Sequence, residues 1–428
     1  MTKFDPISLK ILWDRLVSIS DELVLSLVRT SFSMNVREGY DLSCMVFDSK
    51  ARLLTQGSYS VPSFTGTAPK TIQHMLKKFP PETLVSGDVI MTNDPWMGTG
   101  HLFDINVMRP VFKGKKLVGY TMSVTHLPDI GGKGMSSDCT EIYHEGLRLP
   151  VCKLQDKGRL NELIVDLIRT NVRVPEQTIG DLMANVACNE VGGRSLLEFM
   201  DEYRLEEIES LADAINLHSE LSMREKIKEI PDGNYKNSIQ IEGPGYPILL
   251  NATVDIRGDK VDIDFSGTDG PVRASINVPF CYTNAQSLYV IKCLTIPGLP
   301  NNEGSMRPIS VRAPDTCILN AQPPWPTGGR HSVGHFVVPL LMGALAPALP
   351  KKVQADAAMM NVFSVQGRHR NGEEISSLFF LAGGLGAMYG LDGRAVTPAP
   401  SNMTVVPTEI WENRTSMTIE KRAILENS

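Results

Sequence analysis

Two histidine–aspartate pairs with the same spacing are the strongest chemical signal in this sequence. His101 is followed three residues later by Asp104, and His126 three residues later by Asp129. Each pair lies at the loop edge of a predicted strand, and strand ends about 25 residues apart can converge across a hairpin. Imidazole and carboxylate groups suit zinc, manganese or ferrous iron, whereas a thiolate-rich set would favour structural zinc. The residues alone allow a metal site or, equally, side chains that only cap turns.

A metal ion held by two or three such ligands would leave one position open for water or substrate. It could lower the pKa of a bound water or polarise a carbonyl oxygen, and these are alternative catalytic roles. The stretch before His101 contains Gly98 and Gly100, and glycine lets the backbone approach a site closely.

A third group of interest lies at the predicted start of a helix. His331 and His335 have the i, i+4 spacing that places them on one helix face, and they follow Arg330. Without the acidic partner of a metalloprotease motif, this spacing favours polar structural histidines over metal ligands. Arg330 could instead hold an anionic group near the helix N-terminus.

Familiar nucleotide-binding and nucleophile motifs are missing from the sequence. There is no GxxxxGK(S/T) loop, and no GxGxxG follows a predicted strand. Ser136, Ser137 and Cys139 lie near the second histidine–aspartate pair, but no GxSxG turn supports a nucleophile there. We therefore expect polar loop residues at these positions and no familiar mode of nucleotide binding.

Composition narrows the class of protein. The 428 residues carry a net charge of −6 and are 42% hydrophobic, which argues against broad contacts with nucleic acid or anionic lipid. The longest apolar run, 336–349, contains Pro339 and Pro347 and is too short for a membrane span. Seven scattered cysteines without a CxxC pair fit reduced thiols, and the first residues lack a signal-peptide pattern. We expect a cytoplasmic protein whose partners are proteins or small molecules.

The elements that must position these residues belong to an α/β (α+β) fold. Apolar residues at helical spacing predict a long helix over 6–30, and short apolar runs separated by turns predict strands over 41–125. Helical periodicity returns in an acidic block over 154–229, followed by a β-meander from 239 to 265 and helices near 283–294 and 333–346. We expect mixed, largely antiparallel sheets in three regions: 1–153, 154–230 and 231–428.

Several segments together resemble the hydantoinase B/oxoprolinase family. The resemblance runs in order over essentially the whole chain. The family includes the B-type component of ATP-dependent N-methylhydantoinase, the second half of 5-oxoprolinase, a caprolactamase subunit, and metal-bearing subunits of acetone and acetophenone carboxylases. The matching segments are DLSCMVFD (41–48), NDPW (93–96), HLFD (101–104), THLPDIGG (125–132), DFSGT (264–268), SIN (275–277) and SNM (401–403).

This resemblance implies a heteromeric enzyme in which two kinds of subunit carry out different steps. A separate A-type subunit would bind ATP and phosphorylate the substrate, while this B-type chain would hold a divalent zinc, manganese or iron ion. The family's metal-ligand segments correspond to Asp41, His101, Asp104 and His126. Asp129 would orient a ligand imidazole or serve as a further ligand to a second ion.

Three functions follow from the resemblance. The favoured one is hydrolysis of a cyclic amide, such as a hydantoin, 5-oxoproline or a lactam, with Asp129 or Asp94 as general base. The alternatives are a subunit of an ATP-dependent ketone carboxylase and a non-catalytic scaffold. Family members continue beyond the position matched by 425–428 with a Gly-rich, strand-rich region, so we expect this chain to work in a hetero-oligomer.

Overall fold

The chain begins with a long helix whose start is set by its own capping residues. The computed structural model describes residues 4–356 and 360–424, and the segment 425–428 lies outside the described residues. Helix α1 spans Pro6–Thr30, as its periodicity predicts. The Asp5 side chain accepts hydrogen bonds from the backbone N–H groups of Ile7 and Ser8 at 3.0 and 3.1 Å, and proline is favoured at the first helical position.

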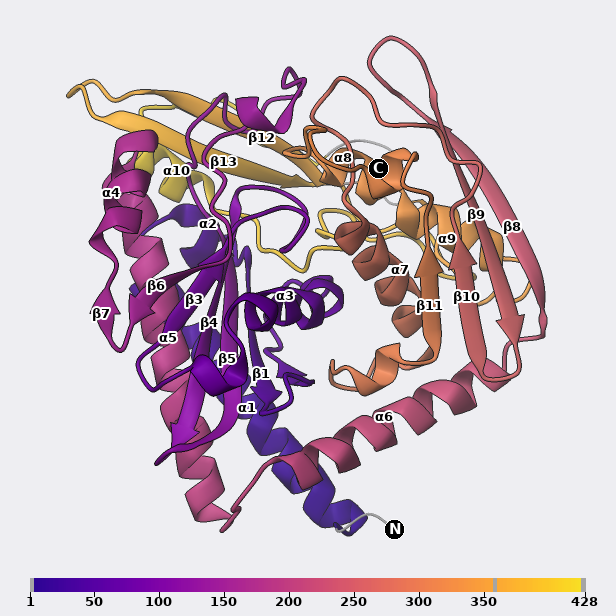
Figure 1. The fold of residues 1–428 in the computed structure, drawn as a ribbon. Coiled ribbons are helices and arrows are strands. Elements are labelled where there is room, and N and C mark those ends of the chain that lie inside the picture. The colour runs from indigo at the N-terminus through magenta and orange to yellow at the C-terminus, as the bar shows by residue number, and fades with distance from the viewer. Residues whose placement is uncertain (1–3, 357–359, 425–428) are drawn as a thin grey trace.

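A seven-stranded antiparallel sheet forms the centre of the N-terminal half (Figure 1). Its order is β2-β1-β5-β4-β3-β6-β7, and the predicted hairpin tip at Lys113 to Lys116 joins β4 to β5. The strands are β1 (Leu42–Asp48), β2 (Leu53–Gln56), β3 (Val89–Thr92), β4 (Asp104–Lys113), β5 (Lys116–His126), β6 (Cys152–Asp156) and β7 (Arg159–Leu160).

Helices cover this sheet on both faces. Cys44 and Val46 of β1 pack into a core with α1 and with α5 (Pro175–Glu202). Met45 and Phe47, which point the other way, pack into a second core with α3 (Phe64–Lys78). Because successive residues of a strand face opposite sides and both sides are covered, β1 is buried along its whole length.

The acidic helical block consists of α4 (Glu162–Asn171), α5 and α6 (Glu209–Lys228). Helix α5 lies against α1, β4 and β5, and Gly192 allows the close approach of α1. A Cβ atom at Gly192 would lie 2.2 Å from Cδ1 of Leu23. These contacts join the block to the N-terminal region. The three-part division of the chain remains a prediction.

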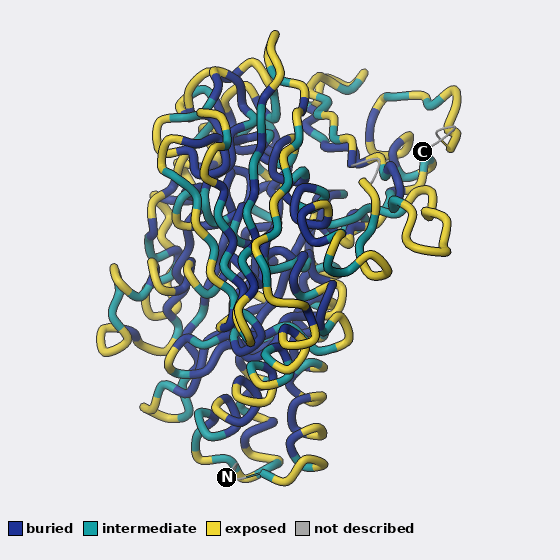
Figure 2. Tube along the Cα trace, turned by 90° about the vertical axis from the view of Figure 1, so that its right-hand side faces the viewer, coloured by how far each residue is buried: buried dark blue, intermediate teal, exposed yellow. Residues whose placement is uncertain are grey.

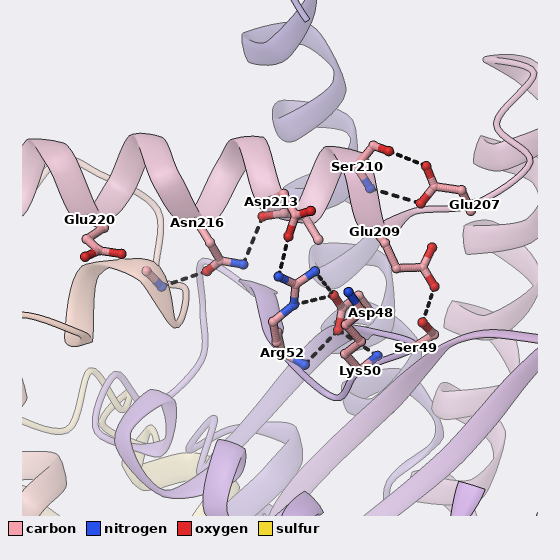
Figure 3. A network of polar contacts seen from close by, with 12 residues as sticks. Asp48, Ser49, Lys50, Arg52, Glu207, Glu209, Ser210, Asp213, Asn216 and Glu220 are labelled. Carbon is pink, nitrogen blue, oxygen red and sulfur yellow. Dashed lines mark hydrogen bonds and ion pairs between the residues drawn. The ribbon is translucent and has the colours of Figure 1, made fainter. Parts of the chain in front are cut away.

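Helix α6 links the two halves, and polar contacts fasten it to the β1–β2 turn (Figure 3). The Arg52 guanidinium lies between two carboxylates: its Nε donates to Asp48 at 2.7 Å, and its Nη1 donates to Asp213 of α6. Ser49 donates to Glu209 at the start of the same helix. Farther along α6, Asn216 accepts a hydrogen bond from the backbone of Gly304 at 2.7 Å.

The C-terminal half contains a four-stranded sheet in the order β11-β10-β9-β8. The predicted meander is antiparallel, and β11 adds in parallel to β10. Helices α7 and α9 pack on one face of this sheet, and α7 contacts α3, so both helices lie between the two sheets (Figure 1). The elements are β8 (Gly233–Ile241), β9 (Ile248–Arg257), β10 (Lys260–Asp264), β11 (Ile309–Arg312), α7 (Phe280–Thr295), α8 (His331–Gly334) and α9 (Val337–Leu345).

The last part of the chain returns to the N-terminal half. A two-stranded sheet packs Met360, Leu378 and Phe380 into the core beside α3. Buried residues follow the interior of both halves, and exposed residues mark loops and much of the C-terminal segment (Figure 2). No helix in the described ranges is long and apolar enough to cross a membrane. The remaining elements are β12 (Met360–Arg368), β13 (Glu374–Ala382), α2 (Met34–Arg37), α10 (Thr408–Arg414) and the 3-10 helices Pro81–Thr83, Ile142–His144, Gly304–Met306 and Ile318–Asn320.

The fold is therefore mixed and largely antiparallel, as the sequence pattern predicts.

Candidate active site

Three adjacent strands place three of the predicted ligands in one row. Asp104 opens β4 and is paired directly with His126, the last residue of β5. Asp41 precedes β1, which pairs with the other edge of β5, and the His126 N–H donates to the Asp41 carbonyl at 3.2 Å. Directly opposed residues on paired strands point to the same face. The row therefore faces the side of the sheet that α3 covers.

His101 reaches this row from the turn before β4. Its Nε2 lies 3.0 Å from Oδ1 of Asp104, and its ring centroid lies 5.1 Å from that of His126. Asp41, His101, Asp104 and His126 are all buried. The structure thus brings together the four residues to which the family resemblance gives a ligand role.

Backbone carbonyls orient both imidazoles. Nδ1 of His101 lies 3.1 Å from the Gly328 carbonyl oxygen, and Nδ1 of His126 lies 2.9 Å from that of Leu127. Because a carbonyl only accepts, His126 is assigned its proton at Nδ1, which leaves a lone pair on its buried Nε2. His101 differs, because its Nδ1 faces the Gly328 carbonyl and its Nε2 faces the Asp104 carboxylate, so both ring nitrogens lie against acceptors.

Burial also keeps these imidazoles neutral. Burial and then the neighbouring His101 lower the pKa of His126 to about 3. Burial and then Arg330 lower the pKa of His101. Neutral imidazole is the form that binds a metal ion.

The two carboxylates differ in their surroundings. Burial opposes ionisation of Asp104, but the side-chain contact with His101 and the charge of Arg330 outweigh it and hold the pKa of Asp104 well below its usual value. Burial and repulsion from Asp104 raise the pKa of Asp41. A cation near the row would favour the ionised form of both groups.

Arg330 supplies positive charge to the row from the C-terminal half. Its Nη2 donates to Asp104 Oδ2 at 2.9 Å, and its Nε donates to the Thr99 carbonyl at 2.7 Å. The guanidinium also lies 4.3 Å from the ring centroid of Tyr282. Gly100, with φ of +102°, makes room for this arrangement, because a Cβ there would lie 2.7 Å from Cδ of Arg330. Arg330 neutralises a protein carboxylate, rather than the external anion that the sequence suggested.

The row lines an inner cavity of ≈50 Å³, which also has His331 and His335 on its wall. Burial and then Arg330 lower the pKa of His335 to about 4, and burial and then His335 lower the pKa of His331. The sequence favoured a purely structural role for both histidines. Their i, i+4 spacing directly after a glycine-rich turn was the available signal for the site.

An outer cavity of ≈450 Å³ adjoins the inner one, and His331, Met135 and Val362 line both. Its size falls within the range of small-molecule pockets. Its other polar residues include Lys133, Ser136, Ser137, Ser275 and Gln366.

The two predicted general bases, Asp129 and Asp94, lie outside the lining of both cavities. Asp129 accepts hydrogen bonds from the Gly131 N–H at 3.0 Å and from Arg173 Nη1 at 2.9 Å. Asp94 accepts from Arg148 Nε at 2.8 Å and from the Trp96 N–H at 3.0 Å. Neither carboxylate lines the inner or the outer cavity.

The donor chemistry of the row fits a divalent ion, but its side chains do not yet enclose one. Two imidazoles stand beside two carboxylates, which is a suitable mixture for zinc, manganese or iron. As the side chains stand, no three His, Cys, Asp or Glu residues within 4–356 and 360–424 form a group that could hold a metal ion. Binding would therefore require side-chain rearrangement, and the metal role of Asp41, His101, Asp104 and His126 remains a prediction.

Comparison with known proteins defines the class. Residues 5–428 match the hydantoinase B/oxoprolinase family. The chain belongs to this family.

The chain matches its relatives over part of their own length. It is 29% identical to the putative B-type component of a D-/L-hydantoinase from Pseudomonas sp. (strain NS671), covering all of this chain and 76% of that protein. It is 30% identical to the beta component of the caprolactamase from Pseudomonas jessenii, covering 92% of this chain and 69% of that protein. It is also 30% identical to 5-oxoprolinase 1 of Arabidopsis thaliana, covering 74% of this chain but 27% of that protein.

Solved structures share the fold. The ATP-dependent caprolactamase from Pseudomonas jessenii superposes with a TM-score of 0.87 at 28% identity, covering 97% of this chain and 74% of that chain. A nucleotide-free acetone carboxylase gives a TM-score of 0.89 at 19% identity, covering 96% of this chain and 58% of that chain. At 19% identity, the similarity to acetone carboxylase shows a shared fold alone.

Proposed function

We propose that this chain is the metal-binding B-type subunit of a heteromeric, ATP-dependent enzyme that opens cyclic amides. The observation that carries the proposal is the buried row itself, in which the imidazoles of His101 and His126 stand beside Asp41 and Asp104. The named relatives support the substrate class, because they include a hydantoinase subunit, a caprolactamase subunit and a 5-oxoprolinase.

The reaction would add water across the ring amide. The bond between carbonyl carbon and nitrogen breaks, carbon gains the hydroxyl group, and nitrogen gains a proton. A divalent ion held by Asp41, His101, Asp104 and His126 would supply Lewis acidity toward the water or the carbonyl oxygen. The inner cavity would hold the reacting amide, and the polar wall of the outer cavity would hold the rest of the substrate.

His331 is better placed than Asp129 or Asp94 to move a proton. It lines both cavities, so it borders the path between substrate and row. Burial and then the adjacent His335 lower its pKa, which keeps the imidazole neutral but makes it a weak base. It would therefore accept a proton only from a water whose own pKa a bound ion lowers. The proton then passes to the leaving nitrogen.

ATP would be used by an A-type partner. The sequence contains no familiar nucleotide-binding motif, and two relatives are themselves named as subunits. The partner would phosphorylate the substrate oxygen. Ring opening by one water would then leave an acyl phosphate, and a second water would release the phosphate and leave the carboxylate.

A ketone carboxylase is the second candidate function. The acetone carboxylase fold covers 96% of this chain, and the same row could serve there. Lactam or hydantoin opening without bicarbonate supports the hydrolase. ATP hydrolysis that requires both a ketone and bicarbonate supports the carboxylase.

The test uses the chain co-purified with its A-type partner. His101→Ala and His126→Ala should each remove bound metal, measured by elemental analysis, and turnover of a panel of hydantoins and lactams. His74→Ala, on the exposed face of α3, should change neither. Turnover that persists without metal would sink the mechanism, and a wild-type chain without stoichiometric metal would favour the scaffold.

A further inference from the structure

A single loop of the C-terminal half supports both His101 and Asp104. We call residues 324–330 the support loop. Its Gly328 carbonyl oxygen lies 3.1 Å from Nδ1 of His101, and its last residue, Arg330, donates to Asp104 at 2.9 Å. The position of this loop therefore sets the orientation of one predicted ligand and the charge balance of another.

Glu145 holds the support loop in place from the N-terminal half. It follows the 3-10 helix Ile142–His144 and is fully buried. Its Oε1 accepts hydrogen bonds from the Gly328 N–H at 2.8 Å and from the Ser275 hydroxyl group. The same peptide segment thus donates to Glu145 through Gly328 N–H and accepts from His101 through Gly328 C=O.

The contacts around Gly328 restrict the position of the support loop. Gly329 donates to the Ser275 carbonyl at 2.6 Å, and Ile142 donates to the Pro324 carbonyl at 3.0 Å. A Cβ atom at Gly328 would lie 3.0 Å from the Ser275 hydroxyl oxygen and 3.2 Å from Glu145 Oε1. Glu145 packs against the loop so closely that glycine is the residue that fits.

Glu145 is an unusual residue for a purely structural contact. A buried carboxylate is costly unless it is well paired, and its second oxygen, Oε2, has no hydrogen-bond partner among the described residues. Burial raises the pKa of Glu145. A glutamine side chain therefore imitates its protonated form and can keep both hydrogen bonds at Oε1.

We propose that Glu145 is a positioning residue: through Gly328 it orients the imidazole of His101, and through the support loop it places Arg330 against Asp104. The positioning role of Glu145 rests on the proposed function only for the measurement of metal affinity. Residues that orient a metal-ligand imidazole typically change metal affinity by about 10- to 100-fold.

The experiment titrates ZnCl2 and MnCl2 into the full metal-stripped chain by calorimetry. Glu145→Ala should weaken affinity by about 10- to 100-fold, and Glu145→Gln should restore values close to wild type. Asp88→Asn is the matched control, because Asp88 is also fully buried and accepts backbone hydrogen bonds from Val85 and Lys157 at the far end of β3. Asp88→Asn should lower the melting temperature without changing metal affinity.

A second readout does not depend on metal. In the metal-free chain with ¹⁵N-labelled histidine, NMR should show the same His101 Nδ1 chemical shift in wild type and in Glu145→Gln. In Glu145→Ala this shift should change, because the Gly328 carbonyl is no longer held against Nδ1. A wild-type chain that binds neither metal refutes the proposed function, and this signal still tests the positioning role.

Two results would overturn the proposal. In the first, Glu145→Ala lowers the melting temperature but leaves metal affinity unchanged. In the second, Glu145→Ala leaves the His101 NMR signal unchanged. If Glu145→Ala does not fold, Ser275→Ala replaces it. It removes one of the two hydrogen bonds to Oε1, and a smaller change in the same two readouts is expected.

Discussion

Nη2 of Arg330 lies 2.9 Å from Oδ2 of Asp104, although 226 positions separate the two residues in the sequence. Asp104 opens a strand of the first sheet, and Arg330 ends the support loop of the other half. Both side chains are buried. The candidate active site is therefore assembled from the two halves of the chain, and its charge is balanced across their boundary.

Removing the positive charge from this pair should destabilise the protein strongly. Arg330→Gln leaves Asp104 as an uncompensated buried charge, which typically costs about 3–5 kcal/mol. Urea unfolding measures the change. Arg15→Gln, which breaks the exposed pair with Glu202, should cost no more than about 1 kcal/mol. Equal effects of both variants would contradict the role given to Arg330.

Asp94 and Asp129 should prove structural. Asp94→Asn and Asp129→Asn each weaken hydrogen bonds with an arginine, Arg148 or Arg173, which is worth about 1.5–3 kcal/mol of stability. The kcat of the assembled enzyme should stay within a few-fold of wild type, since neither group lines a cavity. A large loss of kcat at unchanged stability would restore the general-base role.

His331→Gln should separate chemistry from metal binding. Loss of a general acid–base group costs roughly 100- to 10,000-fold in rate, so kcat should fall while bound metal, measured by elemental analysis, stays at the wild-type level. Loss of metal would instead make His331 a ligand. Unchanged kcat would exclude it from proton transfer.

Two neighbouring glycines of α5 should respond differently to alanine. A Cβ at Gly192 would lie 2.2 Å from Leu23, whereas at Gly193 the nearest atom is Cγ2 of Val111 at 3.3 Å. Overpacking costs about 1–3 kcal/mol, and alanine gains up to about 1 kcal/mol in helix propensity. Thermal melting should show Gly192→Ala destabilised and Gly193→Ala near wild type. The reverse order would contradict the packing of α1 on α5.

Lys292 should make stability depend on pH in the alkaline range. Burial lowers its pKa to about 8 from an ordinary 10.5, and its Nζ donates to the Leu299 carbonyl at 2.7 Å. Between these two pKa values the unfolded chain binds more protons than the folded chain, so stability rises with pH. Relative to Lys292→Met, the wild-type urea midpoint should rise from about pH 7.5 to about pH 10. A constant difference would contradict the lowered pKa.

Local signals predicted much of the fold. Asp5 and Pro6 mark the start of α1, and Lys113 to Lys116 mark the turn of the β4–β5 hairpin. That hairpin explains why Asp104 and His126 meet, since their strands pair residue by residue. Convergence of these two strand ends was predictable because the hairpin is local in sequence.

The remainder of the site depends on contacts between distant segments. Nothing near Arg330 shows that Asp104 will be its partner, and nothing near Glu145 shows that it will hold Gly328. Asp94 and Asp129 were predicted as general bases, a role that has not been tested. Both carboxylates accept hydrogen bonds from arginines 54 and 44 residues away, which no local signal in the sequence indicates.

The sequence separation of Asp104 and Arg330 also determines how long after Asp104 the ribosome adds Arg330. At ~5–20 residues per second, a ribosome needs roughly 10–45 s to make the 226 residues between them. For most of that interval the nascent chain already carries Asp41, His101, Asp104 and His126, but not the segment that closes over them. Biosynthesis therefore leaves this acidic and imidazole-rich row open to solvent before the second half of the protein can seal it.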